Sequence, residues 1–209
     1  MDTTAHHLAA SMLELGAVLL APEKPFTWAS GWLSPIYTDS RRILSAPALR
    51  SWVADRLAER IAVLYPEAET IAGVATGAIA HGVLVAERLG KPFVYVRSKP
   101  KDHGTGALVE GTLPPGTRVV VVEDMISTGK SSLEAVAALR GAGAEVLGML
   151  ALFTYGFDLA AQRFAESGVA LETLSSYQAI LDAALAAGKL RDADMETLRA
   201  WRRDPSAWQ

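Results

Sequence analysis

The sequence contains no cysteine, which excludes structural disulfides, thiolate metal sites and cysteine nucleophiles. It has no apolar run long enough to cross a membrane. Residues 1–7 show no basic region leading into an apolar core, so we expect no secretion signal. The 209 residues carry a net charge of only −3, which disfavours a nucleic-acid surface as the main function. These absences predict a cytoplasmic protein that engages neither nucleic acid nor membrane, with length enough for one substantial core.

The most strongly patterned segment comprises residues 119–132. It opens with four consecutive valines, a run that is typical of a parallel strand buried on both faces. Glu123 and Asp124 follow at the carboxyl end of this strand, and a turn of small polar residues then leads into a helical pattern over residues 133–140. Ligands of open α/β sheets bind beyond the carboxyl ends of the strands. The sequence therefore places a candidate site here.

The chemistry of the turn favours a sugar phosphate. Free backbone N–H groups at a helix start attract an anion, together with the helix dipole, and Gly129 allows the backbone to approach a ligand closely. Glu123 and Asp124 would repel the same phosphate, so they need a partner that welcomes acceptors, such as vicinal hydroxyls or a divalent cation. A sugar phosphate offers an anion and hydroxyls a short distance apart.

Two other interpretations of this turn fit less well. A nucleotide-triphosphate P-loop requires a glycine five positions before Gly129, where this chain has Asp124. An ordinary capped strand–turn–helix explains a single Asp or Ser at a helix start. It does not explain two acids followed by so many small donors.

Two further strands are predicted to end at the same edge of the sheet. Residues 70–75 lead through the turn 76–78 into a helix over residues 79–89, a unit suited to an anion but without a basic residue. In that helix we expect His81 to be a surface or packing residue with no catalytic role. Residues 92–97 form the other strand and run into a basic, glycine-rich loop.

That loop, residues 98–106, has nothing apolar to anchor it and is predicted to be mobile when empty. A charge-rich run is usually a solvated surface turn. Because this one leaves a strand at the ligand edge, we favour a catalytic lid that gathers positive groups over a diphosphate.

The amino-terminal region predicts a helix over residues 7–20, with an apolar side and two prolines beyond it. Residues 26–42 are rich in aromatics, glycine and proline, which fits a hairpin or hood. Two interpretations stay open: a hydrophobic hairpin that covers a sheet edge, or a base-binding lid in which Tyr37 stacks on a planar ring. Elsewhere strands alternate with helices, which predicts an α/β fold with a mostly parallel central sheet flanked by helices.

Residues 119–132 resemble the phosphoribosyl-diphosphate (PRPP) signature of type I phosphoribosyltransferases, in which a strand ends in two acids and enters a phosphate loop. Residues 26–37, 97–104 and 119–132 occur in the same order in orotate phosphoribosyltransferases, which the chain resembles over essentially its whole length. The Lys-Asp-His-Gly segment at residues 101–104 separates it from the hypoxanthine, adenine and uracil enzymes. The resemblance implies one domain over residues 1–209, in which residues 1–45 supply a helix and a hood over the active site.

The resemblance implies Mg²⁺-dependent transfer of the 5-phosphoribosyl group from PRPP to orotate, giving orotidine 5′-phosphate and diphosphate in UMP biosynthesis. It implies that Mg²⁺ is bound mainly through the diphosphate of PRPP and water. It also implies a homodimer in which the loop 98–106 reaches the neighbouring subunit's site. A phosphoribosyltransferase for a purine base and a PRPP- or nucleotide-responsive regulator on the same fold are the alternatives.

The resemblance also assigns site residues. For PRPP binding it implies Arg97, Lys101, His103, Glu123, Asp124, Met125, Ile126, Ser127, Thr128, Gly129, Lys130 and Ser131. It makes Lys101, His103 and Asp124 catalytic, and it places Ser127 against orotate. The chain departs from many bacterial members at three positions, because Ala29, Gly77 and Tyr155 stand where those members carry basic residues.

Substitution at the anomeric carbon of an activated ribose passes through an oxocarbenium-like transition state. The enzyme must therefore stabilise the departing diphosphate and hold the cationic sugar near acceptors. We expect Arg97, Lys101 and His103 to serve the first need with Mg²⁺. We expect Asp124 and Glu123 to serve the second by fixing the ribose hydroxyls.

Overall fold

The computed structural model describes residues 3–28, 31–98 and 108–208. The chain forms two compact units, Ala46–Leu174 and Met1–Ser45 with Ser175–Gln209. Among the described helices, none is both long and apolar enough to span a bilayer.

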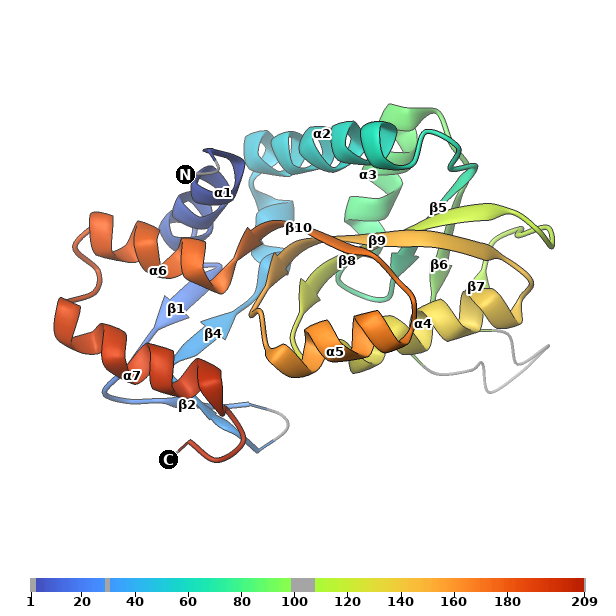
Figure 1. The fold of residues 1–209 in the computed structure, drawn as a ribbon. Coiled ribbons are helices and arrows are strands. Elements are labelled where there is room, and N and C mark those ends of the chain that lie inside the picture. Colours follow the sequence, from blue (N-terminus) through green and yellow to red (C-terminus); the bar gives the residue numbers. More distant parts are fainter. Residues whose placement is uncertain (1–2, 29–30, 99–107, 209) are drawn as a thin grey trace. The chain divides into compact units, whose positions relative to one another are not determined.

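A six-stranded sheet forms the centre of the larger unit (Figure 1). Its strands are β5 (Thr70–Val74), β6 (Phe93–Val96), β7 (Val109–Glu110), β8 (Arg118–Ile126), β9 (Glu145–Thr154) and β10 (Leu171–Ser176). They lie in the order β10-β9-β8-β5-β6-β7. The pairs β9–β8, β8–β5 and β5–β6 are parallel, and β7 runs antiparallel to β6 at one edge. The last two residues of β10 belong to the smaller unit.

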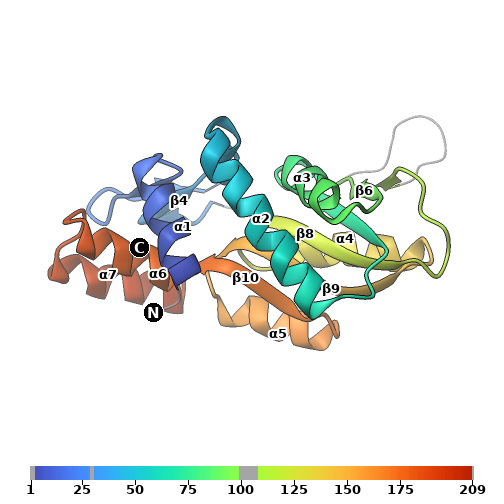
Figure 2. The ribbon, with the colours of Figure 1, turned by 90° about the horizontal axis from the view of Figure 1, so that it is seen from above.

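Helices cover both faces of this sheet. They are α2 (Pro47–Leu64), α3 (Ile79–Leu89), α4 (Lys130–Gly141) and α5 (Asp158–Glu166). The first two lie on one face and the last two on the other, as Figures 1 and 2 show from two directions. The predicted α/β class with a mostly parallel, helix-flanked sheet is confirmed.

The central strand β8 explains the valine run. Val119, Val120, Val121 and Val122 are all 0% exposed, because β5 and β9 pair with both edges of β8 and helices cover both sheet faces. Close approach of α3 to the sheet is possible because Gly82 lies over Phe93. A Cβ at Gly82 would lie 2.6 Å from the Phe93 ring, so the absence of a side chain at Gly82 lets the first turn of α3 pack directly on the sheet.

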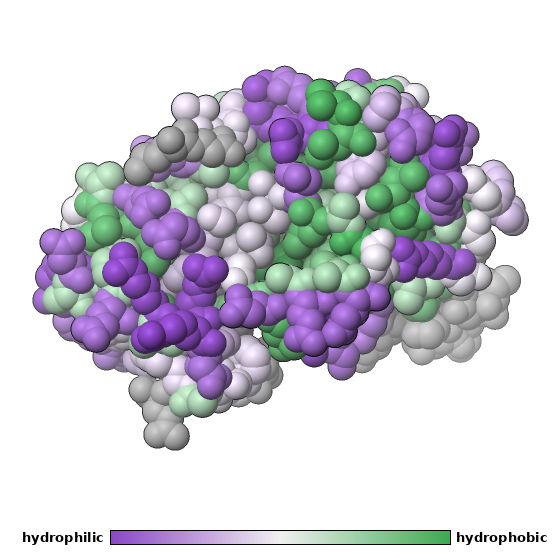
Figure 3. Space-filling view, viewed as in Figure 1, coloured by the Kyte–Doolittle hydropathy of each residue, from purple (hydrophilic) through white to green (hydrophobic). Residues whose placement is uncertain are grey.

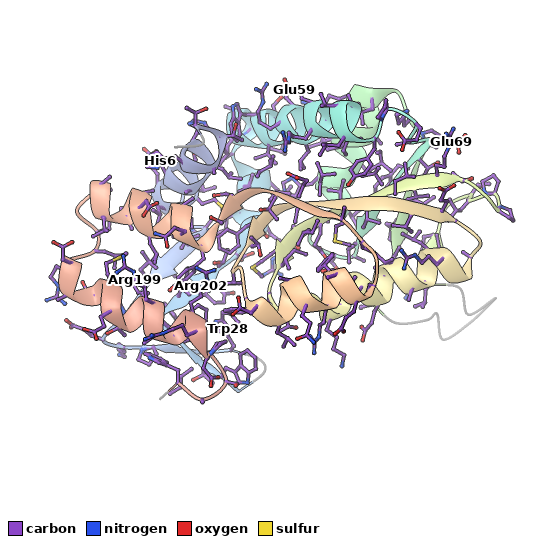
Figure 4. The ribbon with its side chains drawn as sticks, viewed as in Figure 1. His6, Trp28, Glu59, Glu69, Arg199 and Arg202 are labelled. Atoms are coloured by element: carbon purple, nitrogen blue, oxygen red, sulfur yellow. The ribbon has the colours of Figure 1, made fainter. Side chains whose placement is uncertain are left out.

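An ion pair lies at the amino-terminal ends of the strands. Arg118 at the start of β8 donates to Glu69 from Nη2 at 3.1 Å, just before β5 begins, and Glu69 is labelled in Figure 4. Figure 3 shows hydrophilic and hydrophobic residues interspersed over the visible face of the larger unit. Its described exposed large apolar residues, Val63, Leu64, Val83 and Leu159, belong to three different helices.

The smaller unit contains short strands, three α-helices and one 3₁₀ helix in its described part. They are α1 (Thr3–Glu14), β1 (Val18–Leu20), β2 (Phe26–Thr27), β3 (Leu33–Ser34), β4 (Ile36–Thr38), the 3₁₀ helix η1 (Ser40–Ser45), α6 (Tyr177–Ala186) and α7 (Asp192–Arg203). Its core is centred on Trp201, which is fully buried, donates from Nε1 to the Leu33 carbonyl at 3.0 Å and meets Trp28 edge-on at 5.6 Å. Figure 4 labels Trp28 beside α7.

The predicted helix over residues 7–20 is wrong at its carboxyl end. α1 stops at Glu14, and Gly16 then adopts φ 70°, a left-handed conformation that ends the helix. The following residues form β1, which pairs antiparallel with β4. Leu19, expected on the apolar side of a helix, is 43% exposed. The β2–β3 pair confirms a hairpin within residues 26–42. A role for Tyr37 against a base stays a prediction.

Candidate active site

The two acids at the end of β8 have different surroundings. Glu123 is only 4% exposed. The Ser132 hydroxyl donates to its Oε2 at 2.8 Å, and the Asp124 backbone N–H donates to its Oε1 at 3.0 Å. Asp124 is half-buried, and its carboxylate lies directly over Gly77, where a Cβ would be 2.1 Å from Oδ2. Glu123 thus braces the start of α4, while Asp124 lies against the turn that follows β5.

This arrangement separates the charges of the pair. Burial raises the pKa of Glu123 well above its ordinary value, and the charge of Asp124 and a hydrogen bond with it act in the same direction. The Ser132 hydroxyl and the Asp124 N–H oppose this shift by stabilising the carboxylate. Because burial dominates, the site favours the protonated form of Glu123 more than water does.

The loop between β8 and α4 is supported from α5. Gly129 has φ 74° and is the N-cap of α4, and no side chain of the described residues caps the helix there. Arg163 Nη1 donates to the Thr128 carbonyl at 3.0 Å, and Gly129 packs so closely on the Phe164 ring that a Cβ would lie 2.9 Å from it. The loop is therefore held while the first N–H groups of α4 keep no side-chain cap, which suits an anion.

The remaining predicted residues of this segment differ in exposure. Met125 and Ile126 are the last residues of β8, and Ile126 is fully buried. Ser127 and Thr128 are half-buried in the loop, and Ser131 is exposed. The Lys130 side chain is 75% exposed and lies 4.0 Å from Glu134, so it points outward in this structure.

The turn after β5 lies next to Asp124 and leads into a buried histidine. It carries Thr76, Gly77 and Ala78, and the Ala75–Thr76 peptide bond is cis. His81, in the first turn of α3, is 0% exposed. Burial lowers the pKa of His81 to about 4; Asp124 opposes this shift and Arg50 adds to it. Of the two positions expected for His81, on the surface or in the interior, the structure has the interior one.

Arg97 lies just beyond β6, at the same sheet edge. Its Nη1 is 3.3 Å from Glu110 Oε1, so the guanidinium already has an acidic partner. With Ser98, Leu108 and Ser131 it lines a cavity of about 380 Å³ whose other lining residues are mostly alanine and valine. Lys101 and His103, predicted to be catalytic, lie outside the described residues, as does Ala29.

Tyr155 is the third of the positions at which the sequence was expected to depart from the family it resembles. It is 1% exposed, stacks on Phe157 at 5.5 Å and meets Phe153 edge-on at 5.0 Å. The side chain therefore supports the end of β9 from within an aromatic cluster.

Several residues that shape this site carried no clear signal in the sequence. Ser132 was expected only as a further donor of the turn, and Arg163 has no motif around it. The contact between Gly77 and Asp124 joins positions 47 apart and follows only from the pairing of β5 with β8. Within the described ranges, no three His, Asp or Glu side chains are grouped to hold a metal ion.

Comparison with known proteins identifies similar chains. The family model described as "Phosphoribosyl transferase domain" matches residues 41–182. The orotate phosphoribosyltransferase of Bacteroides fragilis is 53% identical over 201 residues, which cover 96% of this chain and 95% of that protein. The crystal structure of orotate phosphoribosyltransferase from Aeropyrum pernix has a TM-score of 0.74 and 34% identity, covering 88% of this chain and 99% of that one. The Mycobacterium tuberculosis enzyme in complex with PRPP has a similar fold, with a TM-score of 0.66 and 23% identity over 85% of this chain and 98% of that one.

Proposed function

This chain belongs to the orotate phosphoribosyltransferases, and we propose that residues 123–131 form the site at which it binds PRPP. The reaction transfers the 5-phosphoribosyl group from PRPP to orotate, giving orotidine 5′-phosphate and diphosphate in pyrimidine biosynthesis. The relatives do not favour a purine base or a purely regulatory role.

One observation carries the proposal for the site: a half-buried acid lies at one end of a short loop, and at the other end is a helix start that no described side chain caps. Asp124 ends the strand before the loop, and the N-terminus of α4 follows Gly129. The helix start suits the 5′-phosphate, and the carboxylate suits the ribose hydroxyls. One molecule of PRPP carries both groups.

The proposed mechanism assigns different work to the two acids. As the bond to diphosphate breaks, positive charge develops on the ribose, and the Asp124 carboxylate stabilises it by lying nearby in a partly dry site. Glu123 was expected to bind ribose hydroxyls directly. Its contacts to Ser132 and to the Asp124 backbone support a second role, in which it fixes the start of the loop relative to Asp124.

Mg²⁺ fits this site as an ion carried mainly by PRPP. Such ions are commonly bound by one or two carboxylates together with substrate phosphates and water. Because both oxygens of Glu123 accept hydrogen bonds within the protein, Asp124 is the carboxylate of the pair that can face the ion or the hydroxyls. When bound, Mg²⁺ supplies positive charge to the departing diphosphate.

Positive side chains complete the diphosphate site in this proposal. Arg97 exchanges Glu110 for the diphosphate, and Lys101 and His103 approach from the loop. Lys101→Ala is expected to lower kcat far more than it weakens binding of the 5′-phosphate, because the lysine acts on the leaving group. An unchanged kcat would remove the loop from the chemistry. The same proposal includes that the protein acts in the cytoplasm and that it forms a homodimer.

The function is tested by incubating the protein with PRPP, Mg²⁺ and one base at a time. Orotate should disappear with equimolar release of diphosphate, while hypoxanthine, adenine and uracil should persist. A reaction with adenine or hypoxanthine would replace the assignment by a purine enzyme. Binding of PRPP without turnover of any base would favour the regulatory alternative. Omission of Mg²⁺ with EDTA present is the matched control for the metal.

The proposed dimer can be tested by mixing two inactive variants. Lys101→Ala removes the loop lysine, and Asp124→Asn removes the acid of the β8 site. If each site combines a loop from one subunit with β8 from the other, subunit exchange creates hybrids with one intact site. Activity should then rise well above that of either variant alone. No recovery in mixtures that mass spectrometry shows to have exchanged would contradict loop sharing.

A further inference from the structure

His81 is a buried polar side chain that neither the fold nor the proposed chemistry has yet explained. It is 0% exposed, and neither Nδ1 nor Nε2 has a hydrogen-bond partner in the part of the chain that the structure describes. Leaving such a group unpaired is costly, and each unpaired polar group in a native protein calls for a reason. Space filling is a poor reason, because an aliphatic side chain of similar size would avoid that cost.

The position of His81 connects it to Asp124. His81 lies in the first turn of α3, directly after the turn at residues 76–78 that carries Gly77. Gly77 is the residue on which the Asp124 carboxylate lies. Asp124 also acts electrostatically on His81, raising its pKa against the larger effect of burial, and Arg50 on α2 acts in the opposite direction.

Burial keeps the His81 imidazole neutral near pH 7, with a pKa of about 4. A neutral imidazole has one N–H donor and one acceptor. It can therefore hold a carboxylate through a hydrogen bond without cancelling its charge. A lysine or arginine at the same place would form an ion pair and reduce the negative charge that a cationic sugar requires.

We propose that His81 is a positioning residue for Asp124, whose neutral imidazole donates a hydrogen bond to the Asp124 carboxylate when substrates fill the site. This inference rests on the proposed role of Asp124 at the ribose. His81 touches neither substrate in this scheme. It limits the movement of the carboxylate after PRPP draws Asp124 toward its hydroxyls, and it thereby preserves the geometry that the transfer step needs.

The first test compares variants that keep or remove the donor. His81→Leu removes it at similar volume, and His81→Gln keeps a neutral donor and acceptor. We expect His81→Leu to lower kcat about tenfold, as loss of one hydrogen bond in the transition state would. The KM for PRPP should change by less than about threefold, since ground-state binding is retained. The melting temperature should stay equal or rise, and His81→Gln should recover most of kcat.

Val85→Ala is the matched control, because Val85 is also on α3 and 0% exposed. It should lower the melting temperature and leave kcat per folded molecule unchanged. If His81→Leu behaves like Val85→Ala, His81 is a packing residue and the proposal is wrong. Should leucine not be accommodated, His81→Met provides a flexible side chain without an N–H donor, and the same outcomes apply to it.

A double-mutant cycle separates this inference from the proposed function. Asp124→Asn with nearly normal kcat would overturn the role of Asp124 itself. A low kcat for Asp124→Asn together with a normal kcat for His81→Leu would overturn only the role of His81. If His81 acts through Asp124, adding His81→Leu to Asp124→Asn should lower kcat by less than about threefold more. An undiminished tenfold effect in the double variant would show that His81 acts by another route.

Discussion

Two strand–turn–helix connections meet at the carboxyl edge of the sheet, and they contribute different things. The β8–α4 connection brings an acid, hydroxyl groups and an uncapped helix start. The β5–α3 connection brings a glycine with no side chain and a buried neutral histidine. In the proposed site, the first provides the groups that bind the sugar phosphate. The second determines where the acid of the first can lie, because Asp124 lies on Gly77.

The comparison teaches that the β5–α3 connection shapes the candidate site even though its turn, residues 75–78, has no charged side chain. At Gly77 a side chain would meet Asp124 at 2.1 Å, so any side chain at position 77 requires another position for the carboxylate. The position of the Asp124 carboxylate therefore depends on the residue at position 77, and the motif around either residue alone does not reveal this dependence.

Among these variants, Gly77→Ala should have the largest effect, and the effect should be a loss of catalytic rate. The new Cβ displaces the flexible end of Asp124, and a misplacement of about 1 Å can cost roughly 100-fold in rate. Stability should change by less than about 1 kcal/mol, since only a side-chain end moves. Steady-state kinetics and thermal unfolding measure the two quantities. Gly141→Ala, with open space around its Cβ, is the control, and equal kinetics for both variants would contradict the pairing of Gly77 with Asp124.

Gly129→Ala tests the other connection, where the backbone itself is constrained. Alanine at φ 74° is strained, and its Cβ would lie 2.9 Å from the Phe164 ring, so we expect a loss of about 2–3 kcal/mol in the free energy of unfolding. The KM for PRPP should rise because the loop shifts. Gly168→Ala has φ 59° but no atom within 4 Å of its Cβ. Its free energy of unfolding should fall only by the cost of the strained backbone, about 1 kcal/mol, and its KM for PRPP should be unchanged.

These contrasts show what the sequence could and could not predict. The valine run, the acids and the small turn are contiguous, so local pattern was enough to predict β8 and α4, and the rule for α/β sheets placed the candidate site beyond the end of β8. Ser132 bonding Glu123, Arg163 bonding Thr128 and Asp124 lying on Gly77 each depend on tertiary packing. A strand at residues 171–176 was not predicted, because its sequence mixes threonine, serine and glutamate without a clear alternation of apolar residues. Helix 7–20 was overextended because the apolar spacing continued beyond Gly16.

The buried histidine should make stability depend on pH. The unfolded chain binds a proton at His81 near pH 6.5, and the folded protein binds it only near pH 4, so between these values the unfolded state holds more protons and stability falls as the pH falls. From pH 6.5 to pH 5 the loss from this group is about 2 kcal/mol. Denaturant unfolding of His81→Leu should show a pH dependence that is weaker by that amount. An identical pH dependence in the wild type and the variant would mean that His81 takes up its proton in the folded state.

Glu123 should make stability change with pH in the opposite direction. Because burial raises its folded-state pKa above 4.5, the folded state holds more protons than the unfolded state as the pH rises above 4.5, and stability falls through that window. Glu123→Gln removes this dependence and keeps an acceptor for Ser132. Its stability relative to the wild type should therefore increase with pH. Ser132→Ala is the control that breaks the same hydrogen bond but keeps the carboxyl group. Because the Ser132 hydroxyl lowers the pKa of Glu123, the fall in stability with pH should persist in this variant and become larger.

Lys130→Ala should have the smallest effect of all, although Lys130 lies inside the PRPP segment. Its side chain is 75% exposed and its partner Glu134 is 4.0 Å away and also exposed, so the pair should contribute less than about 0.5 kcal/mol to stability. If the backbone N–H groups of α4 bind the 5′-phosphate, the KM for PRPP should rise by less than about threefold, and added salt should reduce even that difference. A much larger, salt-resistant rise in KM would mean that Lys130 turns inward to the phosphate when PRPP binds. The β8–α4 connection would then bind its anion through side-chain charge as well as through the helix start.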